Sequence, residues 1–331
     1  MSKKKGKKTY STVLPDKFPE RLELMFPPAL AAEVRASFVE RPTTLRINRI
    51  KAGNEVIDEL KSLGFVLEQV DWYKDAYILR NKTKRELTDC APYKLGKIYI
   101  QSLASMVPPL ILDPQLGEKI LDLTAAPGSK TSQIAGMMGM NGELVANDNN
   151  KVRFFKLKHN MELLGVGDGT EKTQAENWKF TLRLEHGGDL TREFPEYFDK
   201  ILLDAPCSAE ARFVTNNPNT FGYWSERKIK EMAYKQRSLL FAAWSALKPG
   251  GILVYSTCTF APEENELQIE RLLERYPEVE LLPIPVKLPP ALPSLSAWKG
   301  KKISTAITPA YRLKPTAQIE GFFVALLRKK A

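Results

Sequence analysis

Four short apolar segments, each followed by a turn and then by a helical pattern, constrain the fold of this 331-residue chain more than any other feature. They are residues 119–123, 142–147, 200–203 and 251–255, and the helical patterns cover residues 130–138, 151–164, 227–247 and 263–276. Short buried strands that alternate with helices are typical of a parallel sheet packed between helices. The sequence therefore predicts an α/β fold, and ligands of such folds bind at the carboxyl ends of the strands.

The chain before residue 96 follows a different pattern. Helical and strand-like segments alternate there, at residues 19–38, 43–50, 56–63 and 76–79. We therefore predict three parts: a basic, disordered tail at residues 1–12, a small α+β domain at residues 13–95 and a larger α/β domain at residues 96–331.

Charge and composition narrow the class of protein. Lysine and arginine (49) outnumber aspartate and glutamate (39), and a basic globular chain often binds a polyanion, above all nucleic acid. The longest apolar stretch, residues 239–247, is far shorter than the ~20 residues of a membrane span. Three cysteines without a CxxC pair argue against a disulfide scaffold or a metal site and fit a reducing cytoplasm. We expect a cytoplasmic monomer without a membrane segment or a metal.

Residues at two of the strand ends suggest a nucleoside cofactor. The first strand runs into a turn of small residues, where the backbone can approach a ligand closely. That turn comprises Thr124, Ala125, Ala126, Pro127, Gly128, Ser129 and Lys130. The second strand ends at Asp148, which can accept hydrogen bonds from both ribose hydroxyls, although capping the next helix is an alternative role. Asp189 is a weaker candidate for the adenine amine.

Two of the three cysteines lie at the other strand ends. Cys207 follows Asp204 after the third strand, and Cys258 follows the fourth. A thiolate is nucleophilic where a cation or a helix dipole lowers its pKa, and Lys130 or a helix start can supply that charge. Buried, inert thiols are the alternative. The residues alone do not decide which cysteine is the nucleophile.

The run of motifs resembles the Sun/Fmu family of RNA cytosine-5 methyltransferases over residues 13–331. The matching segments are RPTTLRIN, IYIQSLAS, LDLTAAPGSKT, ILLDAPCS, KPGGILVYSTCTFAPEENE and EGFFVALLRK, together with Trp224 and Gln236. Ser129 stands where many members have glycine, but the branch that methylates small-subunit ribosomal RNA often shows this AAPGSKT turn. Ala209-Glu210-Ala211 replaces a more usual Gly-Glu-Gly.

This resemblance implies a class I S-adenosylmethionine-dependent methyltransferase fold, with a Rossmann-like sheet, that forms 5-methylcytidine. It implies that Cys258 is the nucleophile, that Cys207 assists product release, and that Lys130 and Asp204 complete the catalytic site. The cofactor site would comprise residues 124–130, Asp148, Arg153, Asp189 and Asp204.

The expected substrate is ribosomal RNA or the small ribosomal subunit, with tRNA as the second choice and a non-catalytic ribosome assembly factor as the alternative. The target cytosine must be unstacked before it can react. The N-terminal domain is the expected RNA-binding part. Arg41, Arg46 and Arg49 are candidate contacts to the RNA backbone, although an ordinary solvated surface also explains them.

Overall fold

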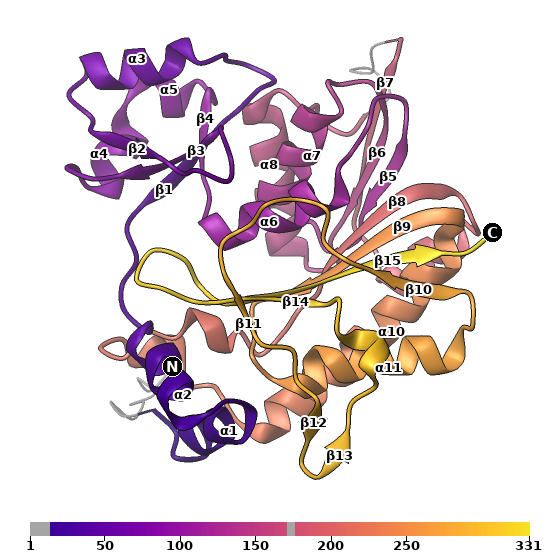
Figure 1. Ribbon diagram of the computed structural model, residues 1–331. Helices are drawn as coiled ribbons and strands as arrows, with labels where there is room; N and C mark the ends of the chain where they lie inside the picture. The colour runs from indigo at the N-terminus through magenta and orange to yellow at the C-terminus, as the bar shows by residue number, and fades with distance from the viewer. Residues whose placement is uncertain (1–13, 171–175) are drawn as a thin grey trace, which may run out of the picture.

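The structure, a computed structural model, describes residues 14–170 and 176–331 (Figure 1). The tail predicted at residues 1–12 lies outside the described residues. Within them, a nine-stranded sheet has the order β11-β14-β15-β9-β8-β5-β6-β7, and β10 pairs with β15. Its strands are β5 (Lys119–Asp122), β6 (Gly142–Asn147), β7 (Trp178–Arg183), β8 (Phe198–Asp204), β9 (Leu247–Thr257), β10 (Val279–Leu282), β11 (Ala291–Leu292), β14 (Tyr311–Leu313) and β15 (Phe322–Lys329).

The strands β5 to β9 pair in parallel, whereas β10, β11, β14 and β15 pair antiparallel. This arrangement confirms the predicted α/β fold with a mostly parallel central sheet. The sequence pattern missed β7, because its residues lack the continuous apolar run of the inner strands.

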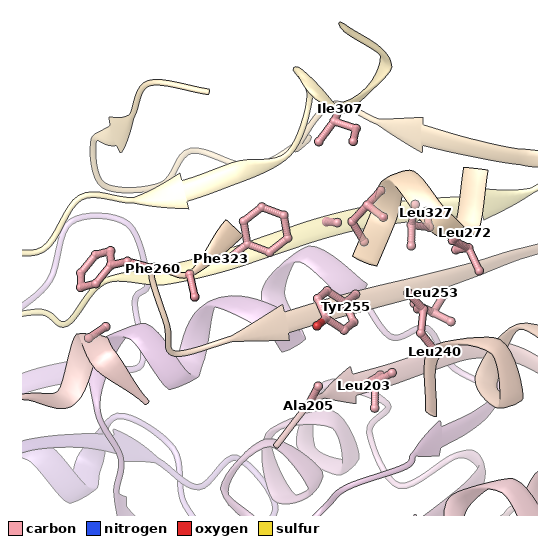
Figure 2. Close-up of a cluster of buried hydrophobic side chains, with 14 of the residues drawn as sticks. Leu203, Ala205, Leu240, Leu253, Tyr255, Phe260, Leu272, Ile307, Phe323 and Leu327 are labelled. Atoms are coloured by element: carbon pink, nitrogen blue, oxygen red, sulfur yellow. The ribbon is translucent and has the colours of Figure 1, made fainter. Parts of the chain in front are cut away.

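Helices cover both faces of the sheet, because successive strand residues point to opposite sides. On β9, Leu253 and Tyr255 join one buried cluster with α10 and α11, whereas Val254 joins another with α6, α7 and α8. Figure 2 shows part of the first cluster, which gathers Leu240 of α10 with Leu253 and Tyr255. The helices are α6 (Leu103–Leu112), α7 (Ser129–Met137), α8 (Lys151–Leu164), α9 (Gly187–Arg192), α10 (Glu226–Ala246) and α11 (Glu266–Arg275). Short 3-10 turns occur at Glu210–Arg212, Pro218–Thr220, Pro262–Glu264 and Thr305–Ile307, and β12 (Ala297–Trp298) pairs with β13 (Lys301–Lys302).

A separate four-stranded antiparallel sheet forms the N-terminal part of the described chain, in the order β2-β3-β1-β4. It comprises β1 (Thr44–Ile47), β2 (Leu67–Gln69), β3 (Ala76–Leu79) and β4 (Ile98–Ile100), with α3 (Glu55–Ser62), α4 (Lys84–Asp89) and α5 (Ala91–Lys94) beside it. Because β4 pairs with β1, this unit extends past the predicted boundary at residue 95.

The first two helices, α1 (Lys17–Met25) and α2 (Pro28–Ala36), lie apart from that small sheet (Figure 1). Phe18 of α1 contacts Phe213 and Trp224 of the large domain, with ring centroids 4.9 Å and 5.6 Å away. The segment predicted as one domain at residues 13–95 is thus divided, because the apolar face of α1 is buried against the large domain. Among the described residues, no helix has both the length and the hydropathy that a membrane span requires.

Candidate active site

A cavity of about 550 Å³ lies at the carboxyl ends of β5, β6, β8 and β9. Six of the predicted site residues line it: Thr124, Asp148, Arg153, Asp204, Cys207 and Cys258. The parallel register explains why distant segments meet here, since Asp204 at the end of β8 lies opposite Ser256 of β9. The loops that carry the two cysteines therefore leave the sheet side by side.

Asp204 is held by two donors at its carboxylate and a third at its backbone carbonyl oxygen. Lys130 Nζ donates to Asp204 Oδ2 at 2.6 Å, and Ser256 Oγ donates to Oδ1 at 2.8 Å. Lys130 also donates to Ser105 Oγ at 2.7 Å, and only 9 % of its side chain is exposed. Thr124 Oγ1 donates to the Asp204 carbonyl oxygen at 2.8 Å. Both carboxylate oxygens of Asp204 are therefore bonded at the wall of the cavity.

The two thiols are in direct contact, with Cys207 Sγ 3.4 Å from Cys258 Sγ. The hydrogen bond from Cys207 lowers the pKa of Cys258, and the nearby positive charge of Arg212 lowers it further. The same bond and burial raise the pKa of Cys207 well above its ordinary value. Cys258 is consequently the thiol that ionises first. The cation is Arg212 and not Lys130, which is paired with Asp204.

Two buried carboxyl groups accept hydrogen bonds from residues near the two cysteines. Glu264 Oε2 accepts hydrogen bonds from the Ser208 backbone N–H at 2.8 Å and from Gln236 Nε2 at 2.9 Å. Glu210 accepts from Trp224 Nε1 at 2.8 Å and from Thr259 Oγ1 at 2.9 Å. These hydrogen bonds therefore hold Ser208 and Thr259, which directly follow Cys207 and Cys258, in the protein interior.

Burial changes the ionisation of these carboxyl groups. It raises the pKa of Glu264 to about 8, with a further contribution from the negative charge of Glu210. It also raises the pKa of Glu210. Ala209, which precedes Glu210, has a left-handed backbone with φ of 57°, the conformation that glycine adopts at the least cost. Ala209 therefore adopts, at some conformational cost, a backbone conformation that the more usual glycine would adopt freely.

The other side of the cavity fits a nucleoside. Asp148 is only 2 % exposed, and its Oδ1 accepts the Asn150 N–H at 2.9 Å. Its Oδ2 is buried without a hydrogen-bond donor, although Arg153 Nη2 lies 3.4 Å away. An unsatisfied carboxylate oxygen beside a cavity suits a hydroxyl donor such as a ribose. The Asp148 side chain does not cap the following helix, because Asn150 caps α8.

The remaining predicted cofactor residues contribute less. Ala125, Ala126, Pro127, Gly128 and Ser129 form the turn behind Thr124 and do not line the cavity. Ala126 offers its carbonyl oxygen to Arg153. Asp189 lies on α9 with 60 % of its side chain exposed and pairs with Arg192 at 2.8 Å, so the structure does not bring it into the site. Its neighbours Gly187 and Gly188 line the cavity, whereas its own side chain points to solvent.

Three arginines expected on the RNA-facing surface have different surroundings. Arg46 is 1 % exposed and donates to Gln101 Oε1 and Ser132 Oγ, which joins the small sheet to α7. Arg49 pairs with Asp75. Arg41 remains half-buried beside a second cavity. The expectation of an exposed contact is therefore wrong for Arg46.

Sequence reasoning also missed residues that the fold brings to the site. The sequence does not reveal the roles of four residues, because each of them contacts or influences a group that is far away in the chain. They are Arg212, Ser105, Ser256 and Glu264. No group of three or more potential metal-ligating side chains occurs in the described ranges.

Comparison with known proteins decides the family. The profile described as 16S rRNA methyltransferase RsmB/F matches residues 109–328. This chain belongs to the RsmB/F family. As a member of this family, the chain is an RNA cytosine-C5 methyltransferase, and its cofactor is S-adenosylmethionine.

Named RsmB/F relatives differ in what they modify and in their length. The tRNA (cytosine(49)-C(5))-methyltransferase of Pyrococcus abyssi is 34 % identical over 87 % of this chain and 88 % of its own length. The ribosomal RNA small subunit methyltransferase F of Enterobacter sp. is 34 % identical over 97 % of this chain but only 64 % of its own length. The crystal structure of a methyltransferase homologue from Pyrococcus horikoshii is 33 % identical, with a TM-score of 0.81 over 96 % of each chain.

Proposed function

We propose that this protein methylates C5 of a cytidine in ribosomal RNA in the cytoplasm, through covalent attack by Cys258. The contact between Cys207 and Cys258, at 3.4 Å beside Asp204, is the observation that carries the proposal. S-adenosylmethionine supplies an electrophilic methyl group, which the C5 carbon of an unmodified cytosine attacks poorly. Addition of a thiolate to C6 makes C5 nucleophilic and divides one difficult step into two easier ones.

The surroundings of the thiols support this division of roles. Arg212 favours the Cys258 thiolate, so the Cys258 sulfur forms the bond to C6. Asp204, fixed by Lys130 and Ser256, would accept a hydrogen bond from the N4 amino group, and in its protonated form it would donate to N3, where negative charge develops as the thiolate adds. The C5 carbon then takes the methyl group.

Release requires removal of the C5 proton and cleavage of the bond from Cys258 to C6. While Cys258 is a thiolate, its hydrogen bond keeps Cys207 protonated. Once the Cys258 sulfur is bonded to carbon, that negative charge is gone, so Cys207 can release its proton to solvent and, as a thiolate, accept the C5 proton. The electron pair of the C5–H bond then re-forms the C5–C6 double bond and expels the Cys258 thiolate.

On the cofactor side, Asp148 would bind the ribose through its unsatisfied Oδ2, with Arg153 and Thr124 beside it. We favour ribosomal RNA because the AAPGSKT turn resembles the small-subunit branch. A tRNA substrate is the second candidate, since the tRNA enzyme of Pyrococcus abyssi matches this chain over 88 % of its own length.

The test compares Cys258→Ala and Cys207→Ala, with Cys90→Ala as the control. Cys90 is a thiol of the small domain, where it bonds the Leu87 carbonyl oxygen. The Cys258 variant should lose all methylation and form no protein–RNA adduct. The Cys207 variant should accumulate an adduct that survives denaturing electrophoresis, because the intermediate forms but is not released. An adduct in the Cys258 variant would make Cys207 the nucleophile.

The substrate is tested with the same protein on equal molar amounts of ribosomal RNA, small subunits and tRNA. Faster methylation of tRNA would replace ribosomal RNA as the proposed substrate. If both cysteine variants stay fully active, covalent catalysis is excluded.

A further inference from the structure

A second cavity, of about 540 Å³, lies beside the one that contains the thiols. Arg212 lines both this cavity and the one that contains Cys207 and Cys258. Four separate parts of the fold form its walls: the connection from α2 to β1, the start of α6, the segment after Cys207, and the connection from β14 to β15. A ligand in this second cavity would therefore lie next to the target base.

The lining of the second cavity combines donors and acceptors. Arg41 and Arg212 are cationic, Glu40 and Glu320 are anionic, and Val39 adds apolar surface. The carboxylates argue against a free phosphate or another small anion, since they would repel it. The two guanidinium groups argue against an apolar ligand. A ligand that carries both a phosphate and a hydrogen-bonding base edge satisfies all of these groups.

Several of these groups have unused hydrogen-bonding capacity. Within the described part of the chain, the Arg212 side chain makes no ion pair within 4.0 Å, and the Arg41 Nε–H is buried without an acceptor. Ser102 begins α6, yet its hydroxyl does not cap that helix. The first N–H groups of a ten-residue helix and a free hydroxyl are good phosphate donors. Glu320 is 6 % exposed and can accept from an amino group.

We propose that this second cavity binds the nucleotide adjacent to the target cytidine, with the phosphate near Arg41, Arg212 and Ser102 and the base edge near Glu320. The volume suits one nucleotide, because small-ligand sites typically occupy about 300–1,000 Å³. This inference rests on the proposed function, since it takes RNA as the substrate. Holding the neighbouring nucleotide would keep the extruded cytosine over Cys258 while the flanking strand stays bound.

The experiment uses short RNAs that contain the target cytidine, with an abasic nucleotide placed on its 5′ side, its 3′ side or neither. The full chain and its Arg41→Gln variant are assayed for methylation at several RNA concentrations. One abasic position should lower kcat/KM of the parent protein about tenfold, which corresponds to about 1.4 kcal/mol. The same abasic nucleotide should add little to the loss already caused by Arg41→Gln, because a nucleotide whose phosphate is no longer held in the cavity has also lost its base contact there.

Two further variants make the result decisive. Asn216→Ala changes an exposed side chain that lines the same cavity and that the fold does not need. This variant should raise KM with little change in kcat. Arg328→Gln is the control, because it removes one positive charge beside Ile252, far from the carboxyl end of β9, where Arg328 pairs with Glu280. This variant should respond to the abasic RNAs as the parent does.

The outcomes separate this inference from the proposed function. Equal rates on all three RNAs, or losses from Arg41→Gln and the abasic position that simply multiply, would overturn the nucleotide site while leaving methylation intact. Absence of methylation and of adduct on every RNA would instead overturn the proposed function.

Discussion

Replacing Glu264 with glutamine should remove part of the pH dependence of stability. Glu264 is 0 % exposed and lies beneath the Cys207 loop, where its Oε1 contacts Ser208 Oγ and its Oε2 accepts two N–H groups. Burial raises its pKa from 4.5 to about 8. The folded protein therefore keeps this carboxyl protonated at neutral pH, whereas the unfolded chain ionises it.

The direction and size of the effect follow from proton linkage. Between pH 4.5 and about 8, the folded state holds one more proton at Glu264 than the unfolded state. Stability from this group is therefore fully present below pH 4.5 and is lost as pH rises toward 8, by about 1.4 kcal/mol per pH unit. From pH 5.5 to 7.5 the loss is on the order of 2–3 kcal/mol. Glutamine cannot ionise, and its amide N–H can replace the carboxyl proton toward Ser208 Oγ.

Urea unfolding of the parent and Glu264→Gln at pH 5.5, 6.5 and 7.5 measures this difference. The variant should lose less free energy of unfolding with pH, by about 2–3 kcal/mol over that range. Glu274→Gln, on the exposed part of α11, should follow the parent. Asp122, whose pKa burial raises to about 7, contributes equally to all three proteins. Parallel profiles for parent and Glu264→Gln would refute a protonated Glu264 in the folded state.

Three further predictions concern other parts of the fold. Asp148→Ala should weaken S-adenosylmethionine binding at least tenfold by calorimetry, about 1.4 kcal/mol, and unchanged affinity would remove Asp148 from the ribose site. Glu266→Ala leaves Arg312 buried at 3 % exposure without its partner, so urea unfolding should show a loss of about 3–5 kcal/mol, and a loss below 1 kcal/mol would contradict this. Gly128→Ala places a Cβ 2.5 Å from a buried methyl carbon at φ of 103°, so the melting temperature should fall, and an unchanged one would show that the turn relaxes freely.

Local patterns in the sequence predicted much of the large domain. The bounds of β6 and α8 match the predicted ranges, because an apolar run and a helical period are visible without knowledge of the neighbours. The strand ends also identified Asp148, Asp204, Cys207 and Cys258, because the carboxyl edge of a parallel sheet collects such residues. The edge strand β7 escaped detection, since four of its six residues are exposed or only partly buried.

Other features depend on contacts between distant segments. The apolar face of α1 packs against the large domain and not against the small sheet that follows it in the chain. Which of these two surfaces buries α1 depends on the tertiary structure. Arg46 reads as a surface charge but bridges two domains in the interior.

The chemistry of the thiols shows the same division most clearly. The sequence by itself determined that two cysteines follow neighbouring strand ends. Only the tertiary structure decided which one ionises first, because 51 residues separate them and their pKa values depend on the register of β8 and β9. That register brings Arg212 near Cys258 and places Glu264 under the loop of Cys207. Electrostatic interactions depend on distance and burial, which a linear order of residues does not contain.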